Sequence, residues 1–187
     1  MNLPNFSSRL RRFSGVATIA LTLGAIPALT EDTMPQAGQA APTFQLPSQD
    51  GSQIGLNEYR GKWVVLYFYP KDGTTGCTIE AHNFQRDLSK YEHLNAVILG
   101  VSVDTTGSHK EFCAQQGLTF KLLADPDKKV VEQYGSLKSM MGMKIAARNT
   151  FLIDPEGKIV KVWTGVDPKT HSETVLSELT ELANKKS

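Results

Sequence analysis

The sequence predicts an α/β domain in which helices flank a mixed central sheet. Two runs, residues 62–69 (KWVVLYFY) and 96–104 (AVILGVSVD), are too continuously apolar for half-exposed strands, so both should lie centrally with covered faces. A helical pattern separates the two runs, and a helix between two buried strands forms the βαβ unit of a parallel sheet. Residues 149–163 add two strands around a Pro-Gly turn at 154–157, and these strands should be antiparallel.

Further elements cover the two ends of the domain. Residues 43–56 contain two short apolar segments around Asp50-Gly51, which predicts an N-terminal β-hairpin. Residues 169–186 predict an amphipathic C-terminal helix, because its apolar residues share one face: Val175, Leu176, Leu179 and Leu182. This order of elements suits a thioredoxin-like layout.

A second helix is expected after the strand at 96–104. Ser108, with Glu111 three residues later, fits a capping box at the start of that helix, and Gly117 fits its end. The helix therefore carries Cys113, one of the two cysteines of the chain.

The composition is that of an ordinary globular domain and gives no electrostatic reason to expect nucleic acid. The chain has 187 residues with 20 Lys and Arg against 19 Asp and Glu, so its formal net charge is +1. Hydrophobic residues make up 40% and charged residues 21%, which is enough to bury a core. We expect no nucleic-acid partner, and one domain at residues 42–187 that follows a linker at 30–41.

Residues 1–29 have the order of an export signal. Arg9, Arg11 and Arg12 precede an uncharged stretch at 13–29, and small or polar residues follow. The apolar part is short for a membrane span. We expect cleavage and export to a periplasm or an equivalent lumen, with no stable membrane partner. An uncleaved N-terminal anchor is the alternative.

Cys77 lies where a thiol can act as a nucleophile. On a helix that begins near Cys77, four apolar residues fall within roughly 40° of the cysteine direction: Ala81, Phe84, Leu88 and Tyr91. Cys77 should therefore lie on the buried face, in the first turn, where unpaired N–H groups and the positive dipole end favour thiolate over thiol. The alternative is a small apolar core residue, and position alone leaves both interpretations open.

Pro70, Thr74 and Cys77 form the pattern P-x-x-x-T-x-x-C, which resembles the active-site signature of the peroxiredoxins. The wider stretch YFYPKDGTTGCTIEA resembles the subfamily of the bacterioferritin comigratory protein, also called peroxiredoxin Q. Residues 148–163, RNTFLIDPEGKIVKVW, resemble a second segment of that subfamily. The resemblance extends over nearly everything from about residue 40 to 182.

The resemblance implies a thiol-dependent peroxidase that reduces hydrogen peroxide and organic hydroperoxides. It implies that Cys77 is the attacking thiolate, that Thr74 and Arg148 donate hydrogen bonds, and that Pro70 shields the pocket. In this family a glutamate at the position of Glu80 belongs to the same hydrogen-bond network. Taken singly, each residue has a structural alternative: a turn-stabilising threonine, a surface arginine, a strand-ending proline, and an acid in the first turn of a helix.

The second cysteine differs in position from that of many relatives. These carry a resolving cysteine five residues after the attacking one, where this chain has His82, and the loop also departs from the subfamily at Gly73 and Thr75. Another subgroup places the resolving cysteine on the next helix, and Cys113, 36 residues after Cys77, matches that arrangement. A disulfide needs Cα atoms within about 7 Å, so one or both helices should unwind before it forms.

The implied cycle needs no cofactor and no metal. The sulfenic acid at Cys77 condenses with Cys113 to a disulfide, which thioredoxin or a similar dithiol protein reduces. The four histidines, His82, His93, His109 and His171, show no metal-ligand spacing with the cysteines except for the pair Cys77 and His82, which point about 140° apart on the helix. Relatives in the subfamily are often monomers, and we expect a monomer here.

Three other functions stay open. The first is a one-cysteine peroxidase in which an external thiol attacks Cys77 and Cys113 is a buried apolar residue. The second is a thiol-disulfide exchanger, although Glu80 occupies the position of the second thiol in a C-x-x-C motif. The third is a non-catalytic exported domain with a permanent disulfide between the two cysteines, which would leave the other motif residues unexplained.

Overall fold

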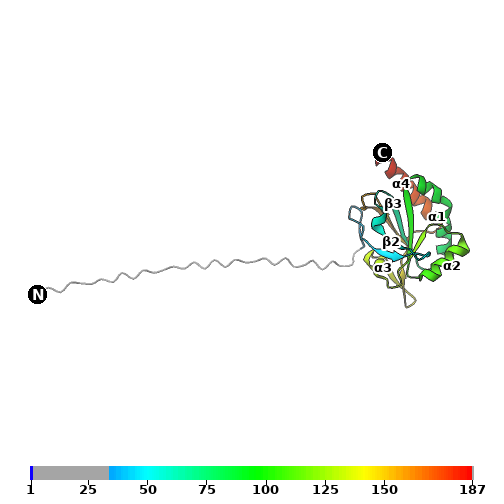
Figure 1. Cartoon of the computed structure of the whole chain (residues 1–187), viewed down its shortest axis with the longest axis horizontal. Coiled ribbons are helices and arrows are strands. Elements are labelled where there is room, and N and C mark those ends of the chain that lie inside the picture. Colours follow the sequence, from blue (N-terminus) through cyan, green and yellow to red (C-terminus); the bar gives the residue numbers. More distant parts are fainter. Residues whose placement is uncertain (2–33, 187) are drawn as a thin grey trace. The chain divides into compact units, whose positions relative to one another are not determined.

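The computed structural model describes Met1 and residues 34–186, which Figure 1 colours along the sequence. Within these residues the central sheet has five strands in the order β5-β4-β3-β8-β9. Their bounds are β3 (Trp63–Phe68), β4 (Ala96–Ser102), β5 (Lys121–Ala124), β8 (Asn149–Ile153) and β9 (Ile159–Thr164). The strands β3, β4 and β5 are parallel, whereas β8 is antiparallel to both of its neighbours. The predicted mixed sheet is confirmed.

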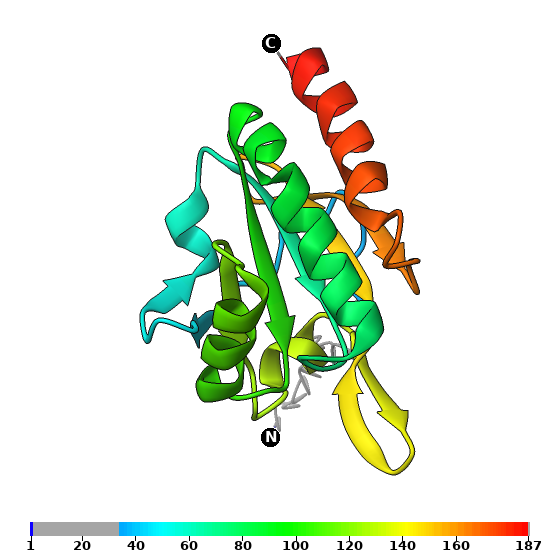
Figure 2. The same ribbon diagram turned by 90° about the vertical axis from the view of Figure 1, so that its right-hand side faces the viewer.

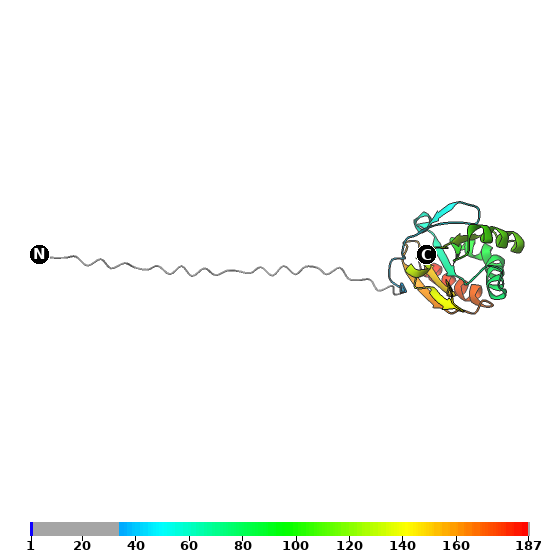
Figure 3. The same ribbon diagram turned by 90° about the horizontal axis from the view of Figure 1, so that it is seen from below.

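Helices pack against both faces of this sheet. One face is covered by α1 (Thr75–His93), α2 (Thr106–Gln116) and α4 (His171–Lys186). Figure 2 shows α1 and α4 side by side, and Figure 3 shows the same helices from below. The two helices are joined by the Tyr91 hydroxyl on α1, which donates to the Ser172 carbonyl on α4 at 2.6 Å. The other face is covered by α3 (Lys129–Gln133), the 3-10 helix η1 (Leu56–Tyr59) and the N-terminal hairpin. This arrangement confirms the predicted thioredoxin-like layout.

Strand β3 is central, as its apolar sequence predicts. All six of its residues are buried, because alternate side chains enter the two cores on opposite faces of the sheet. Val65 and Tyr67 point into the core that α1 and α4 cover, whereas Phe68 points into the other core. The chain leaves β3 shortly before Pro70, so the loop with the motif residues begins at an end of a fully buried strand.

The N-terminal hairpin is confirmed, and a second hairpin is present that the sequence analysis does not predict. The first pairs β1 (Gln45–Pro47) with β2 (Gln53–Gly55), and the second pairs β6 (Leu137–Met140) with β7 (Met143–Ala146). In the second hairpin both turn residues have positive φ, 50° at Met141 and 78° at Gly142. Such a turn normally has Asn-Gly or Asp-Gly, so the methionine conceals the turn signal.

Helix α2 begins one turn earlier than predicted. Its N-cap is Thr105, whose Oγ1 accepts the backbone N–H of Ser108 at 3.2 Å, so the predicted capping box of Ser108 and Glu111 is wrong. The Ser108 hydroxyl is committed elsewhere, because it donates to Asp72 at 2.7 Å. Gly117 ends the helix as predicted, with a left-handed backbone at φ 64°.

Residues 34–41 belong to the domain, although their composition predicts a linker. The Gly38 N–H donates to the Ile159 carbonyl at 2.7 Å, and the Ala41 N–H donates to the Gly157 carbonyl at 2.9 Å. This segment finds its backbone partners beside the start of β9, a tertiary pairing that a small and polar composition does not reveal.

The predicted linker at 30–41 is therefore corrected over its described part, residues 34–41. The export signal predicted for residues 1–29 lies outside the described residues apart from Met1. Among the residues that the structure describes, no helix has the length and apolar character needed to span a bilayer.

Candidate active site

Cys77 is the third residue of α1. Thr74 is the N-cap of this helix, with an extended backbone at φ −76° and ψ 147°. Cys77 is 2% exposed and lies in the same core cluster as Ala81 and Phe84, which follow it on α1. The first-turn position and the buried face are those that the helical spacing predicts.

Arg148 joins Cys77 to Glu80. Its Nη2 donates to the Cys77 Sγ at 3.4 Å, and its Nη1 forms an ion pair with the Glu80 Oε2. Cys77 and Glu80 lie three residues apart on α1, whereas Arg148 comes from the segment between β7 and β8. A negative charge on the sulfur would therefore face both the guanidinium and the N-terminal N–H groups of α1.

Glu80 holds the guanidinium of Arg148 in place through their ion pair. Its side chain is 0% exposed, and burial raises its pKa to about 7, although Arg148 acts in the opposite direction. Burial acts to lower the pKa of Arg148, but the charges of Glu80 and Cys77 outweigh burial and raise it. The Glu80 Oε1 is buried and has no hydrogen-bond partner among the described residues. Glu80 thus keeps the Arg148 cation against the Cys77 sulfur. With a pKa of about 7, the Glu80 carboxylate changes its protonation near neutral pH.

Pro70 and Thr74 lie at the two ends of the loop that precedes α1. Pro70 is half-buried, and Thr74 is exposed. The Thr74 hydroxyl donates to the Lys71 carbonyl at 3.1 Å, so in this state it stabilises the loop and does not bond to Cys77. Its oxygen can still accept, and donation to a peroxide requires that the hydroxyl leave Lys71.

Cys113 lies on α2, buried in the same core cluster as Cys77. Both cysteines are free thiols. The pKa of Cys113 is raised to about 11, first by burial and then by the nearby Asp72 carboxylate. In this state Cys113 is therefore a protonated core residue, and no disulfide joins it to Cys77.

Sequence reasoning missed three neighbours of these groups. Tyr67 lies in the same core cluster as both cysteines, and its pKa is raised first by burial and then by charges that include Glu80 and both cysteines. The carboxylate of Asp72 accepts the Tyr69 hydroxyl at 2.7 Å and contacts α2. Gly76 leaves room for Arg148, since a methyl group at Gly76 would lie 3.3 Å from the Arg148 Nη2. Only Asp72 and Gly76 carried a signal in the sequence, because both lie within the motif stretch from Pro70 to Cys77.

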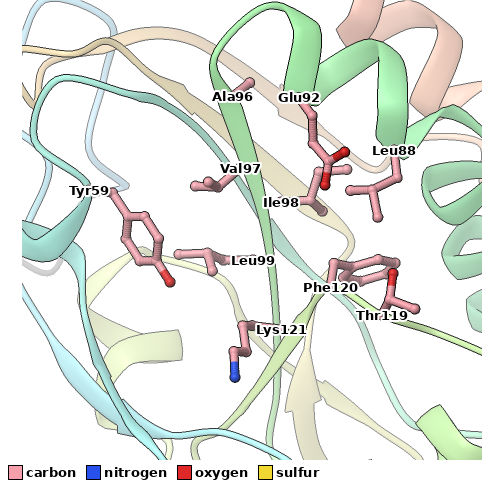
Figure 4. A pocket seen from close by; sticks show the side chains of 10 residues that line it. All are labelled: Tyr59, Leu88, Glu92, Ala96, Val97, Ile98, Leu99, Thr119, Phe120 and Lys121. Atoms are coloured by element: carbon pink, nitrogen blue, oxygen red, sulfur yellow. The ribbon is translucent and has the colours of Figure 1, made fainter.

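A pocket of about 350 Å³ lies elsewhere, beside residues 96–99 at the start of β4 (Figure 4). Its wall includes Tyr59, Leu88, Phe120 and Lys121, and none of the candidate active-site residues lines it. Within the described part of the chain no three His, Cys, Asp or Glu side chains are grouped so that they could hold a metal ion. Cys77, Glu80 and Arg148 meet instead at the N-terminal turn of α1.

The sequence is similar to a protein family and to curated peroxiredoxins. Residues 37–162 match the family described as AhpC/TSA. Peroxiredoxin Bcp of Bacillus subtilis is 40% identical over 154 residues, which cover 80% of this chain and 98% of that protein. A putative peroxiredoxin bcp of Coxiella burnetii is 43% identical over 148 residues, which cover 77% of this chain and 98% of that protein.

Solved structures show the same likeness. A peroxiredoxin Q mutant of Xylella fastidiosa superposes with a TM-score of 0.78 at 35% identity, covering 81% of this chain and 99% of that one. The bacterioferritin comigratory protein of Xanthomonas campestris, described with alkyl peroxide reduction activity, gives a TM-score of 0.71 at 38% identity. That match covers 75% of this chain and 92% of the other.

Proposed function

Since the chain belongs to the AhpC/TSA family, we propose that Cys77 is the attacking thiolate of its thiol-dependent peroxidase activity. One observation carries this assignment: the Arg148 Nη2 lies 3.4 Å from the Cys77 sulfur. An arginine held by Glu80 at this distance gives the sulfur a fixed cationic partner. Among the described residues no cation contributes to the electrostatics of Cys113, and its pKa is raised to about 11.

The first step is a two-electron oxidation of the sulfur. The Cys77 thiolate attacks the terminal oxygen of a hydroperoxide, an S–O bond forms and the O–O bond breaks. The electron pair of the broken bond goes to the departing oxygen, which takes a proton and leaves as water or an alcohol. Arg148 donates toward the oxygens on which charge develops, and Pro70 keeps the loop stiff beside the sulfur.

We assign the resolving step to Cys113. The Cys77 sulfenic acid and the Cys113 thiol condense to a disulfide and release water. Cys113 is the other of the two cysteines in the chain, and it lies in the same core cluster as Cys77. Both cysteines occupy helices, so α2 or the first turn of α1 must unwind locally before the sulfurs meet.

A dithiol protein of the thioredoxin type closes the cycle. Its thiolate attacks one sulfur of the disulfide, which forms a mixed disulfide and releases the other cysteine. Its second thiol then attacks the mixed disulfide and releases the remaining cysteine, so both cysteines return to the thiol form and the reductant leaves as a disulfide. We further propose that the mature protein is an exported monomer without a stable membrane partner. The basic and then apolar order of residues 1–29 supports export, and the monomer rests on the subfamily resemblance.

A one-cysteine cycle is the second candidate. It is favoured by the burial of Cys113 and by its raised pKa, which both oppose attack by this thiol in the resting fold. In that cycle an external thiol attacks the Cys77 sulfenic acid, which forms a mixed disulfide and releases water, and a second external thiol then releases Cys77 as a thiol.

Peroxide consumption by three proteins tests these assignments. We expect Cys77→Ser to lose turnover completely, because a hydroxyl is not ionised at neutral pH. Cys113→Ser should not turn over with thioredoxin as reductant: it should consume one equivalent of peroxide to form the sulfenic acid, and more only as that acid is over-oxidised to sulfinic acid. Mass spectrometry of the wild type after mild peroxide treatment should show a Cys77–Cys113 bridge. Substantial turnover by Cys77→Ser contradicts the nucleophile, and full turnover by Cys113→Ser establishes the one-cysteine cycle.

A further inference from the structure

The Asp72 carboxylate ties the loop before α1 to the first turn of α2. Its Oδ2 accepts the Ser108 hydroxyl at 2.7 Å and lies 2.8 Å from the His109 Nδ1. Its Oδ1 accepts the Tyr69 hydroxyl at 2.7 Å. Asp72 precedes α1, whereas Ser108 and His109 lie on α2, so one side chain connects the segments that carry the two cysteines. We call Asp72, Ser108 and His109 the clasp.

The clasp is nearly closed to solvent. The His109 side chain is 0% exposed and that of Asp72 is 7% exposed. The Asp72 backbone N–H donates to the Asp104 Oδ2 at 2.9 Å, which fixes the loop a second time at the end of β4. These bonds satisfy the Asp72 carboxylate and the His109 Nδ1, whereas the buried His109 Nε2 has no hydrogen-bond partner among the described residues. Removal of a partner from a buried polar group is costly, so the loss of the Asp72 carboxylate should weaken the attachment of α2.

Cys113 lies on the same helix as the two clasp residues Ser108 and His109. It follows His109 by four residues, so the two side chains lie on one face of α2. While the clasp is closed, Cys113 is buried on a helix that Asp72 holds in place. Attack on the sulfenic acid needs a resolving cysteine that can form a thiolate and whose Cα atom lies within about 7 Å of the Cα atom of Cys77. A buried thiol forms a thiolate poorly.

We propose that Asp72 is a positioning residue for the resolving step, because its bonds to Ser108 and His109 must break before Cys113 can reach the sulfenic acid. This inference rests on the proposed role of Cys113. The lifetime of the sulfenic acid then depends on the strength of the clasp. A long lifetime lets a second hydroperoxide oxidise the sulfenic acid to sulfinic acid, with one more S–O bond formed, one O–O bond broken and an alcohol or water released.

The experiment compares how the sulfenic acid divides between disulfide and sulfinic acid. Asp72→Asn removes the charge of the clasp, Ser108→Ala removes one donor, and Glu111→Gln is the matched control on the exposed side of α2. Each protein is mixed rapidly with increasing peroxide, alkylated and analysed by mass spectrometry. The rate constant of the first peroxide reaction is measured in parallel.

We expect Asp72→Asn to form the disulfide at least roughly fivefold faster, since a hydrogen bond to a charged group is lost. Its sulfinic fraction should fall, and its first rate constant should equal that of the wild type. Ser108→Ala should show a smaller change in the same direction, and Glu111→Gln none. If Asp72→Asn does not fold, the disulfide and sulfinic fractions of Ser108→Ala test the role of the clasp. In a Cys113→Ser background, Asp72→Asn should leave the sulfinic fraction unchanged.

Three results would overturn the proposed role of the clasp in the resolving step. The first is an unchanged or raised sulfinic fraction in the clasp variants. The second is a parallel fall of the first rate constant in Asp72→Asn, which would place its effect on Cys77. In both cases the wild-type disulfide remains, so the role of Cys113 survives. The third result, a wild type without an internal disulfide, overturns the clasp together with the resolving role of Cys113.

Discussion

Gly76 lies against the guanidinium of Arg148, close enough that a methyl group there would be 3.3 Å from the Nη2. This separation is tighter than ordinary van der Waals contact, so either the methyl group or the guanidinium must move by a few tenths of an ångström. The same Nη2 donates to the Cys77 sulfur at 3.4 Å. The absence of a side chain at Gly76 therefore helps to place a donor on the sulfur.

Gly76→Ala should lower the rate constant for peroxide reduction by about tenfold, because small displacements of a positioned group are costly in catalysis. The fold should not suffer, since alanine is the better helix former by about 1 kcal/mol. Stopped-flow kinetics and a thermal melt measure the two quantities.

Gly107→Ala is the matched control for this substitution. Gly107 is the second residue of α2 as Gly76 is of α1, and a methyl group there would meet only the Thr105 Oγ1, at 3.7 Å. Its rate constant should equal that of the wild type. An unchanged rate in Gly76→Ala would show that Arg148 tolerates the displacement.

Arg148→Ala should slow peroxide reduction by about 10² or more, by analogy with the loss of one transition-state donor. The buried Glu80 then loses its cation and should take up a proton. Arg86→Ala removes an exposed arginine of α1 that pairs with Asp87 and Glu173, so it controls for a general loss of charge. Equal rates in Arg148→Ala and the wild type would make Arg148 a structural residue only.

Glu80 should make the protein less stable as the pH rises. Its folded pKa is raised from 4.5 to about 7, so the folded state holds a proton that the unfolded state has lost. Its contribution is fully present below about pH 4.5 and decreases as the pH rises toward about 7. His171 acts oppositely, because burial lowers its pKa to about 4 and protonation of the unfolded chain then favours unfolding at low pH.

The difference between wild type and Glu80→Gln isolates this effect, because both proteins retain His171. Urea titrations at steps between pH 4 and 8 give the free energy of unfolding for each. The wild type should lose stability relative to Glu80→Gln across this range. A constant difference would show that Glu80 has the same pKa in the folded and unfolded states.

Export predicts a shortened protein in the cell. N-terminal sequencing of the native protein should find a first residue after the stretch 13–29, in a fraction outside the cytoplasm. The cleavage point should precede residue 34, because residues 34–41 take part in the domain. Native protein that begins at Met1 in the cytoplasm would contradict export.

The parts of the site that the sequence predicts are those with a local signal. Cys77 could be placed on the buried face of the first turn from helical spacing, and β3 could be placed centrally from its apolar run. The roles of the motif residues came from the family resemblance, and they remain predictions. The sequence also supports the turn between β8 and β9, where proline and glycine occur at the required positions.

The parts that could not be predicted depend on partners distant in sequence. The His109 and Asp72 side chains meet across 37 residues, and nothing near either residue signals the other. The sequence therefore shows of His109 only that it lacks metal-ligand spacing, and it does not reveal the contact with Asp72. The segment 34–41 was assigned to a linker because its partners, such as Ile159, lie at the far end of the chain. The hairpin turn at Met141 uses a residue type that rarely adopts positive φ.

The pocket beside β4 marks an open strand edge (Figure 4). Within the described part of the chain β5 pairs with β4 only from Leu99 to Ser102, so the outer side of residues 96–98 borders the pocket. An open edge can recruit a strand from another molecule and seed aggregation. Glu92 and Lys121 line the same pocket, and Lys121 is paired with Asp50. These charges would have to be desolvated by an incoming strand, so the edge is protected against self-association when the protein is concentrated.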